Sequence, residues 1–206
     1  VSSITGDKLE TTGRPTFADN GSTLVIANGA KMVTTNGTAD TAYISDSDAP
    51  TTVTHVAFLD NYLLANKTGS GQFYFADFSG APSTWLAADV FTAESNPDDV
   101  VSLYVNKGII ILLGENTTEF WINDGVSPFS RLQGSTIAHG VMATHSTVFV
   151  NEIEYFFDDR RRLIRLEGSS PSPLDTSFDE TIQAFSTVSD CVSDYVTFNG
   201  HNWILF

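Results

Sequence analysis

Five two-residue turn signals recur along this chain and constrain its fold more than any other feature. Each lies between short runs rich in valine, isoleucine, phenylalanine, tyrosine and threonine, which is the pattern of a β-hairpin. The signals lie at Asn28-Gly29, Asp60-Asn61, Asn106-Lys107, Asn151-Glu152 and Asn199-Gly200, at intervals of 32, 46, 45 and 48 residues. Helix signals are almost absent, so the sequence predicts an all-β protein.

The segments around the turns repeat one order of strands. A third strand is expected at residues 73–77, 118–122 and 163–166, and a weaker fourth at 84–86 and 129–132. A repeat of about 46 residues with up to four short strands is the signature of a β-propeller blade. We therefore expect one β-propeller domain over residues 1–206, with blade-like units at about 15–54, 55–101, 102–143 and 144–186 and a half unit at 187–206.

Two features refine this prediction. Residues 109–113 are consecutive aliphatic residues, which fits a strand buried on both faces between neighbouring blades. Four and a half blades are fewer than a closed propeller usually needs, and the N-terminus lacks an initiator methionine, so we expect an incomplete propeller, a fragment of a larger one. One short helix is expected after Ser177, because Ser177 and Glu180 have the spacing of a capping box.

The composition limits the classes of function. The chain carries 25 Asp and Glu against 10 Lys and Arg, a formal net charge of −15, which excludes nucleic-acid binding by bulk positive charge. A surface of this sign would instead let DNA slide past without sticking. The single cysteine, Cys191, cannot form an internal disulfide, and no stretch is apolar enough for a transmembrane helix.

The residues that commonly build catalytic and metal sites are scattered. The histidines at 55, 139, 145 and 201 lack metal-ligand spacing, and the adjacent His145 and Ser146 lack the surroundings of a nucleophile elbow. The carboxylate pairs at 98–99 and 158–159 fit solvated turns better than a glycosidase site. We therefore predict no enzymatic activity, no catalytic residue, no metal site and no cofactor.

One cluster of charge stands out. Arg160, Arg161, Arg162 and Arg165 gather four of the ten basic residues at one hairpin tip, directly after Asp158-Asp159. In an otherwise acidic chain these arginines are candidates for docking a partner's carboxylates or touching nucleic acid. The alternative is a solvated turn that its own aspartates balance.

Several segments, in order, resemble the packaged-DNA stabilisation proteins of short-tailed bacteriophages, also called head-completion or tail accessory factors. The resemblance is carried by residues 91–98 (FTAESNPD), 114–121 (GENTTEFW), 127–134 (SPFSRLQG), 139–140, 159–161 and 174–182, and covers roughly residues 55–185. The first 50 residues match poorly. The Asp-Arg-Arg segment continues with Arg162 where relatives often have glycine, which leaves partner contacts there open.

The resemblance implies a structural virion protein built on a propeller, at the tail hub or nozzle. It implies a homo-oligomeric ring, with a hexamer as one candidate, that binds portal or adaptor proteins above and fibre, spike or needle proteins below. Such a ring seals packaged DNA and forms part of the genome-ejection conduit, without specific DNA binding or membrane contact. It implies a location in the virion tail, and in the host cytoplasm during assembly.

Two other functions remain open. The first is a carbohydrate-binding or glycan-cleaving propeller that acts as a receptor-binding module, in which Asp98, Asp158, Trp85 and Trp121 would have to meet in one funnel. The second is an intracellular scaffold propeller that binds other proteins.

Overall fold

The computed structural model describes residues 5–10, 13–38, 40–82, 84–93, 97–174 and 176–206. The segments that carry the family resemblance include residues 94–96 and 175, which lie outside the described residues. The described chain contains eighteen β-strands and one short helix, arranged as four four-stranded antiparallel sheets and a two-stranded hairpin. The predicted all-β fold with four-stranded blades is confirmed.

Within each sheet the strands follow one another in chain order. The first sheet consists of β1 (Thr16–Asp19), β2 (Leu24–Ala27), β3 (Val33–Thr35) and β4 (Ala42–Tyr43). The second consists of β5 (Val56–Leu59), β6 (Tyr62–Asn66), β7 (Gln72–Asp77) and β8 (Val90–Thr92). The third consists of β9 (Val100–Asn106), β10 (Ile109–Gly114), β11 (Thr118–Asn123) and β12 (Phe129–Arg131). The fourth consists of β13 (Val148–Val150), β14 (Ile153–Phe157), β15 (Leu163–Glu167) and β16 (Ser170–Leu174), and the hairpin of β17 (Asp194–Phe198) and β18 (His201–Leu205).

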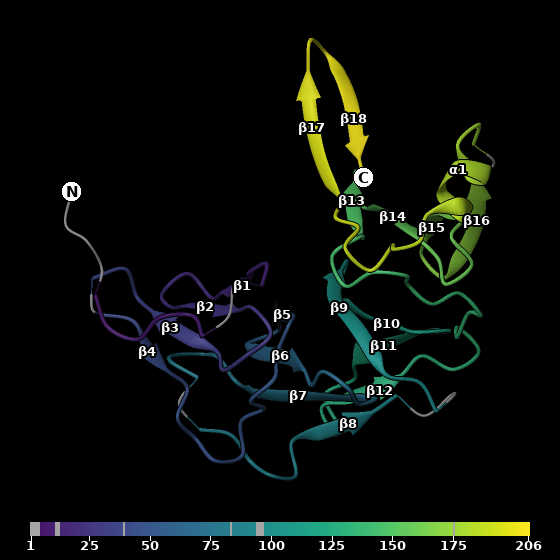
Figure 1. Ribbon diagram of the computed structural model, residues 1–206. Coiled ribbons are helices and arrows are strands. Elements are labelled where there is room, and N and C mark those ends of the chain that lie inside the picture. The colour runs from purple at the N-terminus through teal and green to yellow at the C-terminus, as the bar shows by residue number, and fades with distance from the viewer. Residues whose placement is uncertain (1–4, 11–12, 39, 83, 94–96, 175) are drawn as a thin grey trace.

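The sheets follow one another along an open arc, as Figure 1 shows. First strands of neighbouring sheets contact each other, β1 with β5, β5 with β9 and β13 with β17, so these strands line the inner side of the arc. In the part of the chain that the structure describes, the sheets do not close into a ring. The boundary expected between residues 101 and 102 lies inside β9, which begins at Val100.

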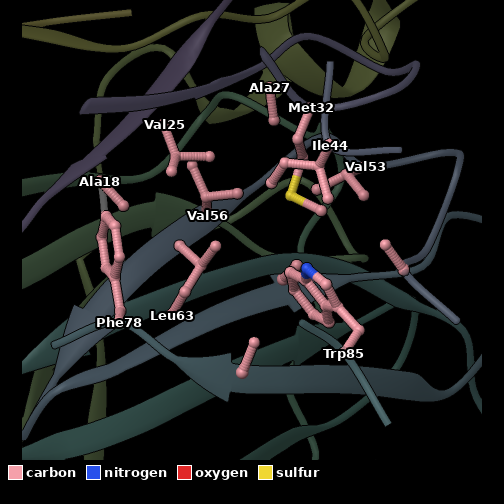
Figure 2. Packing of buried hydrophobic residues seen from close by; sticks show 13 residues of the cluster. Ala18, Val25, Ala27, Met32, Ile44, Val53, Val56, Leu63, Phe78 and Trp85 are labelled. Atoms are coloured by element: carbon pink, nitrogen blue, oxygen red, sulfur yellow. The ribbon is translucent and has the colours of Figure 1, made fainter. Parts of the chain in front are cut away.

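Three apolar clusters fill the spaces between successive sheets. The first, between the first and second sheets, surrounds Trp85, Phe78 and Met32 (Figure 2). The strand β10 is shared by the other two clusters: Ile110 and Leu112 face the second sheet, whereas Ile111 and Leu113 face the fourth. The prediction that residues 109–113 are buried on both faces is therefore confirmed, and it follows from the alternation of side chains along a strand.

The tight turns have the backbone that two-residue hairpins require. Central residues with positive φ join β5 to β6, β9 to β10, β13 to β14 and β17 to β18, at 60–61, 107–108, 151–152 and 199–200. Such turns match the right-handed twist of the strands. The third turn is Lys107-Gly108, one residue later than predicted, because glycine occupies the second left-handed position at no steric cost.

Two local predictions need correction, and one strand, β16, is present that the sequence did not predict. Asn28-Gly29 follows the second strand of its sheet, and the equivalent first turn is at residues 20–23, where the Asn20 side chain accepts backbone hydrogen bonds. The fourth strand of the second sheet is β8 rather than residues 84–86, because Trp85 packs into the first cluster instead. The strand β16 contains Pro171 and Pro173, which an edge strand tolerates.

The predicted helix is present as α1 (Asp179–Ala184), but its expected cap is wrong. Phe178 occupies the N-cap position, with no side-chain cap hydrogen bond. Instead of Ser177, the Asp179 carboxylate closes the turn by accepting hydrogen bonds from the backbone N–H and hydroxyl of Thr176. Among the described residues, none of the helices is long and apolar enough to cross a membrane.

Candidate interaction surfaces

The predicted arginine cluster lies at the turn between β14 and β15, around a fully buried carboxylate. Asp158 is 0% exposed, and its Oδ2 accepts hydrogen bonds from Arg162 Nη2 at 2.7 Å and from His139 Nδ1 at 3.1 Å. Its Oδ1 accepts the backbone N–H groups of Arg160 and Arg162. Burial alone would raise the pKa of Asp158, but these hydrogen bonds hold it below its usual value. Arg162 therefore stabilises the turn itself.

Of the other three arginines, two make contacts within the chain and one is mainly exposed to solvent. Arg161 donates to the carbonyl oxygens of Gln183 and Phe185 at 2.8 and 2.7 Å, which ties the turn to the end of α1. The side chain of Arg160 is 60% exposed beside Asp159. Arg165 lies along β15 and pairs with Glu167 at 2.7 Å. The four guanidinium groups thus do not form one uniform basic patch, and Arg160 presents the most accessible charge.

The hairpin β17–β18 carries an exposed apolar face. Val196 lies opposite Trp203, and Asp194 lies opposite Leu205, so strand alternation places Val196, Phe198, Trp203 and Leu205 on one face. These four side chains, which we call the hairpin face, are 41–64% exposed. The half-buried residues Tyr195 and Ile204 occupy the other face, and β17 contacts β13 of the fourth sheet. Among the residues that the structure describes, nothing covers the hairpin face on the side away from the fourth sheet.

Two histidines that lie far apart in the sequence, His55 and His145, meet at the inner side of the arc. His55 is 1% exposed, its ring stacks on His145 with centroids 5.2 Å apart, and its Nε2 lies 3.1 Å from the Tyr104 hydroxyl. Burial lowers the pKa of His55 to about 3, so this histidine is neutral at physiological pH. Within the described chain no three His, Cys, Asp or Glu side chains are grouped to hold a metal ion. The cluster joins three blades through residues 49 and 90 positions apart in the sequence, which no local pattern reveals.

A family model described as bacteriophage P22 Gp10, β-propeller, matches residues 3–164. The chain belongs to this family of phage DNA-stabilisation proteins. The match begins much nearer the N-terminus than the resembling segments indicate, and it ends before residues 174–182. No curated protein sequence matches the chain.

Solved structures with a similar fold are distant in sequence. Dihydro-heme d1 dehydrogenase NirN superposes with a TM-score of 0.60 at 12% identity, over 93% of this chain and 41% of that one. The extracellular domain of a hybrid two component system from B. thetaiotaomicron gives 0.58 at 11% identity, over 96% and 27%. The computationally designed Ika4 protein gives 0.50 at 12% identity, over 77% and 94%. At these identities the likeness concerns the fold alone.

The residues that a glycan site would need do not meet in this phage protein. Trp85 and Trp121 are buried in different core clusters. Asp98 accepts hydrogen bonds from the backbone N–H groups of Glu115, Asn116 and Thr117 at 2.8–2.9 Å, and so latches the turn between β10 and β11. Asp158 is held by the arginine turn. These four side chains therefore serve packing and loop closure.

Proposed function

We propose that this phage DNA-stabilisation protein is a non-catalytic structural subunit of the short tail, at the hub or nozzle. In this proposal, copies assemble into a ring that seals packaged DNA and forms part of the conduit through which the genome leaves. Portal or adaptor proteins would lie above the ring, and fibre, spike or needle proteins below. The family membership supports a virion role in DNA stabilisation, and the finer placement is ours.

The hairpin face is the observation that supports assembly of several copies into a ring. Three apolar clusters lie between successive sheets among the first four, whereas Phe198 and Trp203 of the hairpin expose more than half of their surface. Large exposed aromatic side chains gathered on one sheet face are typical of a protein interface. The hairpin is the first half of a fifth blade-like unit, so a further blade of the same propeller and a second copy are both possible occupants of its open face. We propose the second copy for the ring, because ring subunits make repeated contacts between unlike surfaces of identical chains.

The charge of the chain supports the conduit. A net charge of −15 repels phosphate groups, so DNA would pass a wall made of this protein without forming strong contacts. The arginine turn does not oppose this, since each of its guanidinium groups lies beside a carboxylate or a backbone carbonyl of the same chain.

The test is to measure the mass of the chain by light scattering and its uptake onto DNA-filled heads that lack tails. We expect the chain to form a ring, and the heads that take it up to keep their DNA inaccessible to nuclease. A Phe198→Ser, Trp203→Ser variant should stay monomeric and leave heads leaking. Val126→Ser is the matched control, because Val126 is 86% exposed in the turn between β11 and β12 of the third sheet. A monomeric parent chain that ignores heads would overturn the proposal, as would equal loss of assembly in the control.

A further inference from the structure

A cavity of about 190 Å³ lies between the third and fourth sheets. Its apolar walls come from both sheets, with Ile109, Ile111 and Phe120 on one side and Leu166 on the other. Its mouth lies between two neighbouring hairpin turns, where Lys107 Nζ and Glu152 Oε2 form an exposed ion pair at 2.7 Å. The cavity is therefore a narrow apolar space that opens to solvent at one charged end.

Glu154 also lines this cavity and is its one anomalous residue. The side chain is 1% exposed, and neither carboxylate oxygen has a hydrogen-bond partner among the described residues. Glu154 lies opposite Leu166 and two residues from Phe156, so strand alternation directs it toward the third sheet and into the apolar space. Buried polar groups almost always have partners, and an exception calls for an explanation.

The fold does not need a carboxylate at this position. The neighbouring residues on the same face are Phe156, Leu166 and Ile164, which pack into the third apolar cluster. A leucine at position 154 would continue that cluster without the cost of burying an unpaired carboxyl group. The lysine that lies at the mouth, Lys107, is already paired with Glu152, so none of the described residues supplies the missing partner.

We propose that this cavity binds an alkylammonium group, with the ammonium at the Glu154 carboxylate and the aliphatic stem between Ile111, Phe120 and Leu166. A metal ion fits poorly, because calcium and magnesium need about six oxygen ligands and these walls are mainly aliphatic and aromatic. An alkylammonium matches both parts of the cavity, since it has a charged head with N–H donors and an apolar stem. The group can come from a free aliphatic amine or from a lysine side chain of another protein.

The proposal carries a proton linkage that can be measured. Burial raises the pKa of Glu154 to about 8, so the empty site is largely protonated at neutral pH and binding an ammonium must release that proton. Affinity should rise about tenfold per pH unit up to pH 8 and then level off until the amine itself loses its charge, near a pKa of about 10.4. The other ionisable groups at the site are Tyr104 on β9, the Lys107–Glu152 pair and Glu167 on β15. His55, which contacts Tyr104, stays neutral over this range.

The experiment is calorimetric titration of the 206-residue chain with n-butylammonium and with Nα-acetyl-lysine methylamide in amine-free buffer. Comparators are n-butanol, which has the stem without the charge, and tetramethylammonium, which has a charge without N–H donors. We expect saturable binding of an amine and none of the comparators. Glu154→Gln should weaken binding by about tenfold or more, whereas Glu167→Gln, an exposed carboxylate at the edge of the same cavity, should leave it within about twofold.

Each outcome decides the proposal. Binding of the lysine derivative identifies a protein side chain as a possible source, binding of butylammonium alone identifies free amines, and both support the site. Three results would overturn the proposal: no amine binding at pH 8.5, equal binding by Glu154→Gln, or equal binding of n-butanol. In each case Glu154 would be a protonated carboxyl group that only water contacts. If Glu154→Gln does not fold, the parent chain decides, because a constant affinity between pH 6 and 8 contradicts a role for Glu154. The inference does not rest on ring assembly, which has its own measurement.

Discussion

Replacing Glu154 with glutamine should remove a large part of the pH dependence of the stability of this protein between pH 4.5 and pH 8.5. Burial raises the pKa of this carboxyl group from its ordinary 4.5 to about 8. A carboxyl group whose pKa is higher in the folded chain favours folding while it is protonated. That stability is fully present below pH 4.5 and is lost as pH rises toward 8. Glutamine cannot ionise, so the variant escapes this loss.

The magnitude follows from the two pKa values. Each pH unit between them is worth about 1.4 kcal/mol. Because Glu154 ionises in the unfolded chain but stays protonated in the folded chain, the parent protein loses about 3 kcal/mol of stability by pH 7 and about 5 kcal/mol well above pH 8, relative to low pH. Glutamine also buries a polar group without a partner, but that cost is the same at every pH. We therefore compare the unfolding free energy of the variant with that of the parent at pH 4.5 and again at pH 8.5. The informative quantity is how much this difference changes between the two pH values.

Urea unfolding of both proteins, followed by tryptophan fluorescence in amine-free buffer, measures this quantity. Other carboxylates titrate equally in the two proteins, and their contributions cancel. We expect the variant to gain about 4 kcal/mol relative to the parent between the two pH values. A difference that stays constant to within about 1 kcal/mol would refute the conclusion that Glu154 is buried without a partner.

Three further substitutions test the structural contacts by urea unfolding at pH 7. Asp98→Ala should cost about 2–4 kcal/mol, because it leaves three backbone N–H groups of a partly buried turn without their acceptor; a loss below about 1 kcal/mol would contradict the latch. Gly140→Ala should prevent stable folding, because a methyl group there overlaps the backbone of the β10–β11 turn, whereas Gly80→Ala, with no atom within 4 Å, should be neutral; equal effects would show the close approach to be absent. Arg162→Ala should cost about 3 kcal/mol, because the buried Asp158 carboxylate loses its guanidinium partner and keeps only His139 and two backbone N–H donors. Arg160→Ala should cost less than about 0.5 kcal/mol; a larger loss for Arg160→Ala than for Arg162→Ala would show that Arg162 does not hold the turn.

The repeated fold was predictable because its signals are local. Turn pairs such as Asp60-Asn61 and Asn151-Glu152 prefer left-handed backbone conformations, and aliphatic runs mark strands between sheets. The boundaries were less accessible: Asn28-Gly29 has the composition of a hairpin turn, yet the strand pairing of the first sheet places the turn earlier. The strand β16 could not be predicted, because Pro171 and Pro173 argue against a strand and are tolerated only at the edge of a sheet, a position that the local sequence does not reveal.

The candidate sites were predictable only in part. The position of the arginine turn follows from the sequence, but the buried Asp158 that organises it depends on His139, which reaches it from another segment. The pairing of His55 with His145 depends on how three blades meet. The sequence does contain one indication that Glu154 is buried. It points to the same face of its strand as Phe156, and both faces of that strand are apolar. A charged residue in such a run is more readily interpreted as the solvent side of a strand.

The position of β10 as a common wall between two apolar clusters has a consequence for how related chains vary. Ile110 and Ile111 are neighbours in the sequence, yet their side chains belong to separate clusters with no shared members. Ile110 shares its cluster with Phe73 of the second sheet, and Ile111 shares its cluster with Phe156 of the fourth. Energetic coupling follows shared packing rather than chain order. In related chains, a substitution that changes the side-chain size at residue 110 is therefore expected to be compensated by a substitution at residue 73, across the blade interface. Substitutions at the adjacent residue 111 are expected to be independent of both.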